Sequence, residues 1–275
     1  MLYELFNTVS TFTFVLLSAI SGSTTGPTYD FQIQKDVVYH QVDGVELKGD
    51  LYLPTGSPLR AAVMTVHGGS WNSLICDMEG VARHLAKQGF VVFNVRYRLA
   101  PKYIYPAALE DVAAAAAWLN QNAVRLNVDP KKIATWGYSS GAHLALYVGL
   151  NAKNNLSAIV AGGSPTDFAL FDPVGIRTVT FMGGSFHDKK DLWLEASPVR
   201  RVSEDSPPVF LYHGPKDDLT PIQQMLNMRD ALQAKKVPVE TFEVAFWGHA
   251  GVYVFSVEAV ERGTKFLFER FNLPR

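Results

Sequence analysis

The sequence has almost no cysteine and almost no net charge. Cys76 is the only cysteine among the 275 residues, so no intramolecular disulfide framework holds the fold. Because lone cysteines are mostly buried or incidental thiols, Cys76 is not our candidate nucleophile. The chain has 25 lysines and arginines against 26 acidic residues, with the two signs interspersed. This balance excludes the basic stripe of a nucleic-acid-binding protein and favours a small uncharged substrate over a polyanion.

The sequence also lacks a long apolar run. The longest stretch of this kind, VSTFTFVLLSAI over residues 9–20, is too short to span a bilayer comfortably. It is similar to the apolar region of a signal peptide, with cleavage after Ser21 and export to the periplasm or medium. The alternative is an apolar N-terminal helix packed on a cytoplasmic domain. Glu4, and the absence of Lys and Arg from the first eight residues, favour that alternative.

Metal and phosphate motifs are missing as well. No spacing of His, Cys and Asp indicates a metal site, and no Gly-rich phosphate loop is present. His187 stands next to an aspartate in SFHDKK, but no second cluster accompanies it, so an exposed loop is expected there. We therefore predict an activity that needs no cofactor.

What the sequence does contain is a regular alternation of strand-like and helix-like stretches from Asp36 onward. Asp43-Gly44 separates two alternating runs and predicts a hairpin. Strands are expected in VVYHQV, VELKGDLYLP, AAVMTVHGG, FVVFNVRY, KIATWGY, SAIVAGG, PPVFLYHG and VPVETFEV. Helices are expected over 78–89 and in PAALEDVAAAAAWLNQNA, where Pro106 suits the first turn, in GAHLALYVGL and in EAVERGTKFLFERF. This order predicts one α/β domain over 22–275, with a mostly parallel sheet, helices on both faces and an antiparallel N-terminal hairpin.

Residues 164–206 interrupt the alternation. The segment is rich in aromatic residues, glycine, proline and charge, and it contains Phe168, Phe171, Phe181, Met182, Phe186 and Trp193. Long connections in compact domains are often lids or binding elements. We expect a lid-like insertion here, and short helices that only pack on the domain are the alternative.

The sequence GYSSG over 137–141 follows an expected strand and precedes an expected helix. This is the context in which G-x-S-x-G forms a sharp turn that projects its serine above the sheet. Ser139 is then a candidate nucleophile, and the helix behind it favours developing negative charge. On its own the motif is weak, because glycine and serine are common in turns.

Three further stretches supply the groups that such a serine needs. HGGSW over 67–71 follows a strand, and the main-chain N–H groups of Gly69, Ser70 and Ser140 are candidates for an oxyanion hole. Asp217 or Asp218 is a candidate to orient a histidine. His249, in a loop after the next strand, is the candidate base. The order Ser, Asp, His is that of the α/β-hydrolases.

The chain resembles α/β-hydrolase carboxylesterases, specifically the bacterial feruloyl-esterase-like and hormone-sensitive-lipase-like groups. The resemblance extends from about Asp36 to the C-terminus. It rests on HGGSW, VRYRLAPKYIYPAALEDVAAAAAWL, GYSSGAHLAL, SPPVFLYHGPKDDLTP and GHAG. It implies the α/β-hydrolase fold, a triad of Ser139, Asp217 and His249, and an oxyanion hole at Gly69, Ser70 and Ser140.

Two departures affect the substrate class. Ser70 stands where the hormone-sensitive-lipase-like group has a third glycine, and GYSSG stands where it has G-D-S-A-G. At these positions HGGSW and GYSSGAH are closer to the feruloyl-esterase-like group and to kynurenine-formamidase-like hydrolases.

These features together predict a serine carboxylesterase that hydrolyses small short-acyl or aryl esters through an acyl-enzyme. A small amide or formamide hydrolase with the same triad is the alternative. Trp71 is expected to line the substrate pocket, with packing as the other interpretation. His67 is expected to brace the oxyanion loop, and His143 is expected to pack or cap on the helix after the nucleophile. The expected partner is a small-molecule ester, with no nucleic acid and no stable membrane span.

Overall fold

The computed structural model describes residues 28–56, 59–170 and 176–274. The expectations for residues 1–21 and for Phe171 lie outside these ranges. Within them, no helix is long and apolar enough to cross a membrane.

The described residues form an eight-stranded sheet in the order β1-β2-β4-β3-β5-β6-β7-β8. β1 pairs antiparallel with β2, and β2 pairs antiparallel with β4, while all other neighbours are parallel. The strands are β1 (Phe31–Val42), β2 (Val45–Pro54), β3 (Ala62–Val66), β4 (Val91–Val95), β5 (Ile133–Tyr138), β6 (Ala158–Gly162), β7 (Val209–His213) and β8 (Val239–Glu243). The expected fold class, a mostly parallel sheet entered by an antiparallel hairpin, is confirmed.

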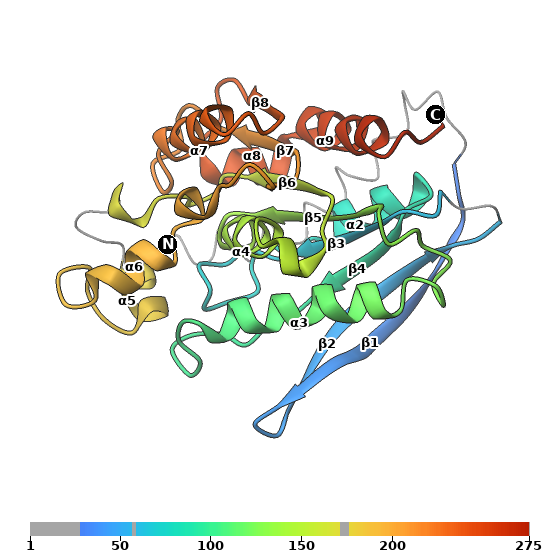
Figure 1. The fold of residues 1–275 in the computed structure, drawn as a ribbon, viewed down its shortest axis with the longest axis horizontal. Helices are drawn as coiled ribbons and strands as arrows, with labels where there is room; N and C mark the ends of the chain where they lie inside the picture. The colour runs from blue at the N-terminus through green and yellow to red at the C-terminus, as the bar shows by residue number, and fades with distance from the viewer. Residues whose placement is uncertain (1–27, 57–58, 171–175, 275) are drawn as a thin grey trace.

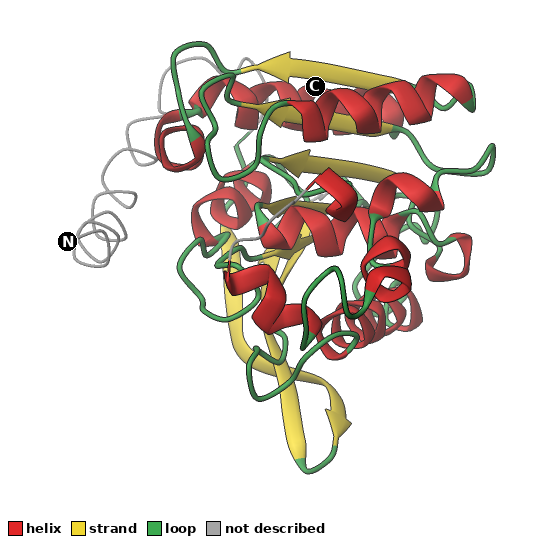
Figure 2. Cartoon of the chain, turned by 90° about the vertical axis from the view of Figure 1, so that its left-hand side faces the viewer, coloured by secondary structure: helices red, strands yellow, loops and turns green. Residues whose placement is uncertain are grey.

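The N-terminal hairpin turns at Asp43 and Gly44, whose φ angles are 50° and 76°. Both residues are therefore in the left-handed region that a two-residue turn between twisted strands requires. The turn end of the hairpin projects beyond the helices (Figures 1 and 2).

Helices cover both faces of the sheet (Figure 1). The buried side chains of α2 (Glu79–Lys87) and α9 (Val257–Arg270) share one apolar cluster with the sheet. Those of α3 (Ala107–Gln121) and α4 (Ser140–Gly149) share a second cluster, and α7 (Gln223–Ala234) packs with α4 in a third. Pro106 precedes α3 as its N-cap instead of lying in its first turn. The sequence analysis did not predict α7, because polar residues interrupt its apolar pattern.

In the described part of segment 164–206 lie four short helices: η2 (Phe168–Leu170), α5 (Ile176–Met182), α6 (Lys190–Glu195) and η3 (Pro198–Arg201). The side chains of Phe168, Phe181, Met182 and Trp193 are all buried in the same cluster as α3 and α4. These side chains therefore pack the insertion onto the domain.

Candidate active site

Ser139 lies between β5 and α4, at the carboxyl end of a central parallel strand. Its φ of 55° and ψ of −126° lie in a region that non-glycine residues rarely adopt. The turn is compact: a Cβ at Gly141 would lie 2.2 Å from the carbonyl oxygen of Val66, so no larger residue fits without a backbone shift. The Ser139 N–H donates to the Gly162 carbonyl at 2.8 Å, which fixes the turn to β6. Because such strain persists only where the surroundings enforce it, this geometry marks a functional position.

The structure brings Ser139, His249 and Asp217 together in one chain of contacts. His249 Nε2 lies 2.8 Å from Ser139 Oγ, and His249 Nδ1 lies 2.7 Å from Asp217 Oδ2. The three residues come from the ends of β5 and β7 and from the start of α8 (His249–Phe255). We expected His249 in a loop, but it is the first residue of α8, with Gly248 as N-cap. The apolar residues after it continue as a helix because they pack onto the domain.

Asp217 faces His249, whereas Asp218 is exposed to solvent. Asp217 Oδ1 accepts from the N–H groups of Leu219 and Thr220 at 3.0 and 2.8 Å. Thr220 Oγ1 lies 2.8 Å from Asp217 Oδ2 and 3.1 Å from His249 Nδ1. Thr220 was not predicted from the sequence, although an Asp followed three residues later by a hydroxyl residue indicates a side-chain-capped turn.

The environment keeps Asp217 ionised. Burial raises the pKa of this carboxyl, but hydrogen bonds from His213, His249 and the Thr220 N–H outweigh it, so the pKa lies well below its usual range. His213 Nε2 lies 3.3 Å from Asp217 Oδ2 and 2.6 Å from the Thr220 carbonyl. A permanent negative charge at this position stabilises a protonated His249 and holds its ring in place.

The loop after β3 packs directly against Ser139. A Cβ at Gly68 would lie 3.3 Å from Ser139 Cβ and 2.8 Å from the Tyr138 carbonyl, so this close approach requires glycine. Gly69, Ser70 and Trp71 all have positive φ, at 116°, 55° and 60°. Within the described part of the chain, the N–H groups of Gly69 and Ser70 donate to no backbone carbonyl. The Ser140 N–H opens α4, where the first N–H groups of a helix have no intrahelical partner.

Trp71 is buried and packs inside the domain. Its ring stacks on Phe181, with centroids 4.6 Å apart, and its Nε1 donates to His143 Nδ1 at 3.1 Å. His143 Nε2 in turn donates to the Ala196 carbonyl at 2.8 Å. The expected packing of His143 is therefore present. These contacts fasten the loop over residues 67–71 to α4 and to the insertion. The role of Trp71 in substrate contact stays a prediction.

Burial makes His67, His143 and Cys76 poor candidates for proton transfer or attack. It lowers the pKa of His67 and of His143 to about 4, so both are neutral at pH 7. His67 stacks on Tyr97 and its Nδ1 donates to the Gly68 carbonyl at 2.8 Å, as expected of a brace for the loop. Burial raises the pKa of the Cys76 thiol to about 12, which keeps it protonated. His187 is exposed and lies beside Asp188.

No group of three or more His, Cys, Asp or Glu side chains in the described ranges has the arrangement of a metal site. Ser139, His249 and the ionised Asp217 instead lie in contact at the carboxyl end of the parallel strands, and the loop that carries Gly69 and Ser70 packs against Ser139. This arrangement can carry out acyl transfer through a covalent intermediate.

The BD-FAE family model matches residues 49–232, which is more than half of the 275 residues. The chain belongs to the BD-FAE family. Esterase LipC of Mycobacterium tuberculosis is 30% identical over 190 residues, which are 62% of this chain and 47% of LipC. Kynurenine formamidase of Meyerozyma guilliermondii is 31% identical over 213 residues, covering 70% of this chain and 79% of that protein.

This BD-FAE chain spans about half the length of LipC, and 60% of the carboxylic ester hydrolase LipM from the same organism. Among solved structures, a truncated carbohydrate esterase from gut microbiota has a TM-score of 0.79 at 23% identity, covering 90% of this chain and 100% of that one. The apo form of Thermogutta terrifontis esterase 2 has a TM-score of 0.75 at 22% identity, with 90% and 97% covered. The α/β-hydrolase fold of this chain is therefore shared with these esterases.

Proposed function

We propose that this protein is a serine carboxylesterase that hydrolyses small esters with short acyl or aryl groups. The observation that carries the proposal is the continuous contact from Ser139 Oγ through His249 to Asp217, at 2.8 and 2.7 Å, with Ser139 in a strained turn. Membership of the BD-FAE family supports the same activity.

The roles follow from the geometry. His249 removes the proton from Ser139, which attacks the ester carbonyl, and Asp217 stabilises the imidazolium that forms. The oxyanion is bound by N–H groups of Gly69, Ser70 and Ser140, each typically worth roughly 3–4 kcal/mol of transition-state stabilisation. His249 then protonates the leaving alcohol. Water, activated by the same histidine, releases the acid from Ser139.

The test is hydrolysis of p-nitrophenyl acetate, butyrate and octanoate and of methyl ferulate, with Ser139→Ala alongside. The wild type is expected to cleave the short esters, and the variant is expected to lose this activity. The order of rates from acetate to octanoate then indicates the size of the acyl pocket. A wild type inert on all four esters, or a Ser139→Ala variant as active as the wild type, would overturn the proposal.

A formamidase is the second candidate, because the chain covers 79% of a kynurenine formamidase at 31% identity. The same triad would attack a formyl amide, and His249 would protonate the leaving amine. Rates on 4-nitrophenyl formate and 4-nitroformanilide separate the two candidates. Comparable kcat/KM on the anilide favours the formamidase, and a large preference for the formate ester favours the carboxylesterase.

A further inference from the structure

An arginine from the insertion lies beside the oxyanion loop. Arg177, on α5, places its Nη1 3.4 Å from the side-chain oxygen of Ser70, whose main-chain N–H we assign to the oxyanion hole. The guanidinium therefore contacts the side chain of a residue that we assign to the oxyanion hole. This contact depends on the hydroxyl of Ser70, at the position where the sequence analysis noted a departure from a third glycine.

The two segments that carry Arg177 and Ser70 pack against each other. Phe181, one turn further along α5, is buried and stacks on Trp71, with ring centroids 4.6 Å apart and planes 10° from parallel. The Phe181 carbonyl accepts from the N–H of Tyr105 at 2.8 Å. The backbone that carries the arginine is thus held next to the oxyanion loop.

The side chain of Arg177 presents its positive charge at the surface beside Ser70. Its side chain is exposed, and among the described residues it has no carboxylate partner, only the neutral Ser70 hydroxyl. Arg98, by contrast, has an acidic partner: its buried guanidinium lies 2.7 Å from Asp111, measured from Nη2 to Oδ1. An arginine without an acid presents a planar fork of N–H donors that matches a carboxylate in a bidentate geometry.

We propose that Arg177 forms a subsite for a carboxylate on the acyl group of the substrate, so that the enzyme prefers monoesters of short dicarboxylic acids. This inference rests on the proposed esterase function and names its substrate class. It differs from the expectation of a small uncharged substrate, which came from the net charge of the whole chain, because that sum does not show where an individual charged side chain lies.

The experiment compares methyl hydrogen succinate with methyl butyrate, two esters of similar length that differ by a terminal carboxylate in place of a methyl group. Rates are measured by titration of released acid, in wild type, Arg177→Gln, Arg177→Lys and Arg262→Gln. The ratio of kcat/KM for succinate over butyrate is expected to fall about 10-fold in Arg177→Gln, the loss of one charge-assisted hydrogen-bonded pair. It is expected to recover in part in Arg177→Lys and to stay at the wild-type value in Arg262→Gln, on the distant helix α9.

The preference is also expected to weaken as sodium chloride is added, because an exposed charge pair is screened by salt. An unchanged ratio in Arg177→Gln would overturn the proposal. So would an equal loss on both esters, which would assign Arg177 to loop structure instead.

A binding measurement separates this proposal from the proposed function. Calorimetry measures the binding of methyl hydrogen succinate to Ser139→Ala and to the Ser139→Ala/Arg177→Gln double variant. Because neither protein hydrolyses the ester, the measurement tests the subsite alone. Weaker binding in the double variant supports the subsite even if the wild type cleaves neither ester. Equal binding in both proteins contradicts the subsite, whatever the esterase assay shows.

Discussion

Ser139 has a backbone conformation, φ 55° and ψ −126°, that costs an L-residue roughly 1–3 kcal/mol and costs glycine much less. Ser139→Gly and Ser139→Ala both remove the hydroxyl and its contact with His249, but only glycine relieves the strain. We expect Ser139→Gly to be more stable than Ser139→Ala by about 1 kcal/mol or more, and both to be inactive. Urea unfolding of the two variants measures the difference. Equal stabilities would mean that the turn is not strained.

The indole of Trp71 makes a buried hydrogen bond, from Nε1 to His143 Nδ1 at 3.1 Å. Trp71→Phe removes the donor and leaves the imidazole nitrogen unpaired, which costs about 1–3 kcal/mol of stability. Because Trp71 adjoins Ser70, we also expect a lower kcat. Trp247→Phe is the matched control, since Trp247 is 41% exposed and surface changes usually stay within about 0.5 kcal/mol. Denaturation and kinetics on both variants check this, and similar losses in the two would contradict it.

At the scale of elements, one buried amide joins the insertion to α7. Gln224 Oε1 accepts from the N–H groups of Thr166 and Asp167 at 2.8 and 2.7 Å, and Gln224 Nε2 donates to the Asp167 carbonyl at 3.0 Å. Gln224→Ala leaves these buried backbone groups unpaired, so we expect a loss of roughly 2–4 kcal/mol. Gln223→Ala, the exposed neighbour on the same helix, is expected to change stability by less than about 0.5 kcal/mol. Chemical unfolding compares them, and equal effects would show that the amide does not hold the insertion.

The central strands were predictable because each is a short apolar run bounded by turn residues. Their order in the sheet was not predicted, because apolar runs do not show which strands pair. The position of Ser139 could be predicted from a motif that needs a fixed strand-turn-helix context. His249 could be singled out only as a histidine after a late strand, and its helix α8 was not predicted. Helix α7 could not be predicted, because its buried face includes Gln224, a polar residue whose burial depends on a partner loop far away in sequence. The contact between Arg177 and Ser70 joins positions 107 residues apart and has no local signal.

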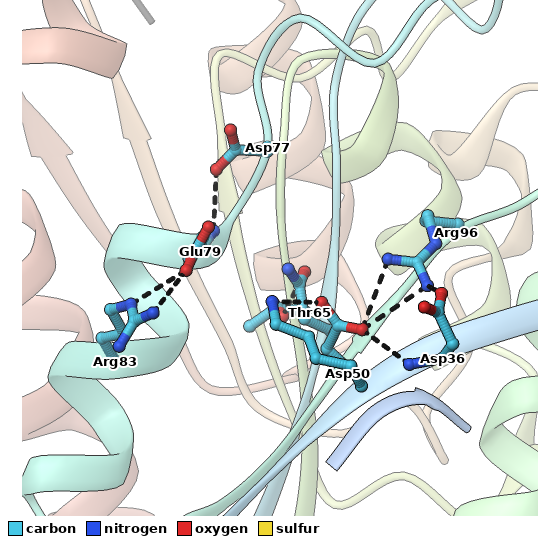
Figure 3. Close-up of polar contacts among 9 residues, drawn as sticks. Asp36, Asp50, Thr65, Asp77, Glu79, Arg83 and Arg96 are labelled. Carbon is cyan, nitrogen blue, oxygen red and sulfur yellow. Dashed lines mark hydrogen bonds and ion pairs between the residues drawn. The ribbon is translucent and has the colours of Figure 1, made fainter. Parts of the chain in front are cut away.

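At the scale of the whole molecule, the buried carboxylates set the response to acid. Asp50 accepts from Lys35 Nζ at 2.8 Å and from the Asp36 N–H at 3.0 Å, and Arg96 lies beside it (Figure 3). Burial raises the pKa of Asp50, but these partners outweigh it and the pKa is lowered overall. Asp217 has a lowered pKa for similar reasons. Asp77 has the opposite shift, because burial raises its pKa and the Glu79 charge adds to this increase.

The sign of the pH dependence follows from these directions. An unfolded Asp titrates near pH 4, and the folded pKa of Asp50 lies below that, so its stabilising contribution is present above about pH 4 and is lost as the pH falls through the folded pKa. Asp217 acts in the same direction, whereas Asp77, with a raised pKa, acts in the opposite one. We expect the free energy of unfolding to decrease as the pH is lowered below about 4.

Asp50→Asn is expected to be less stable than the wild type at pH 7 and to lose less stability on acidification, because its side chain carries no charge to protonate. Urea unfolding between pH 3 and pH 7 measures both slopes, with the exposed Asp205→Asn as control. If Asp50→Asn lost as much stability as the wild type over this range, the acid response would have to come from other groups.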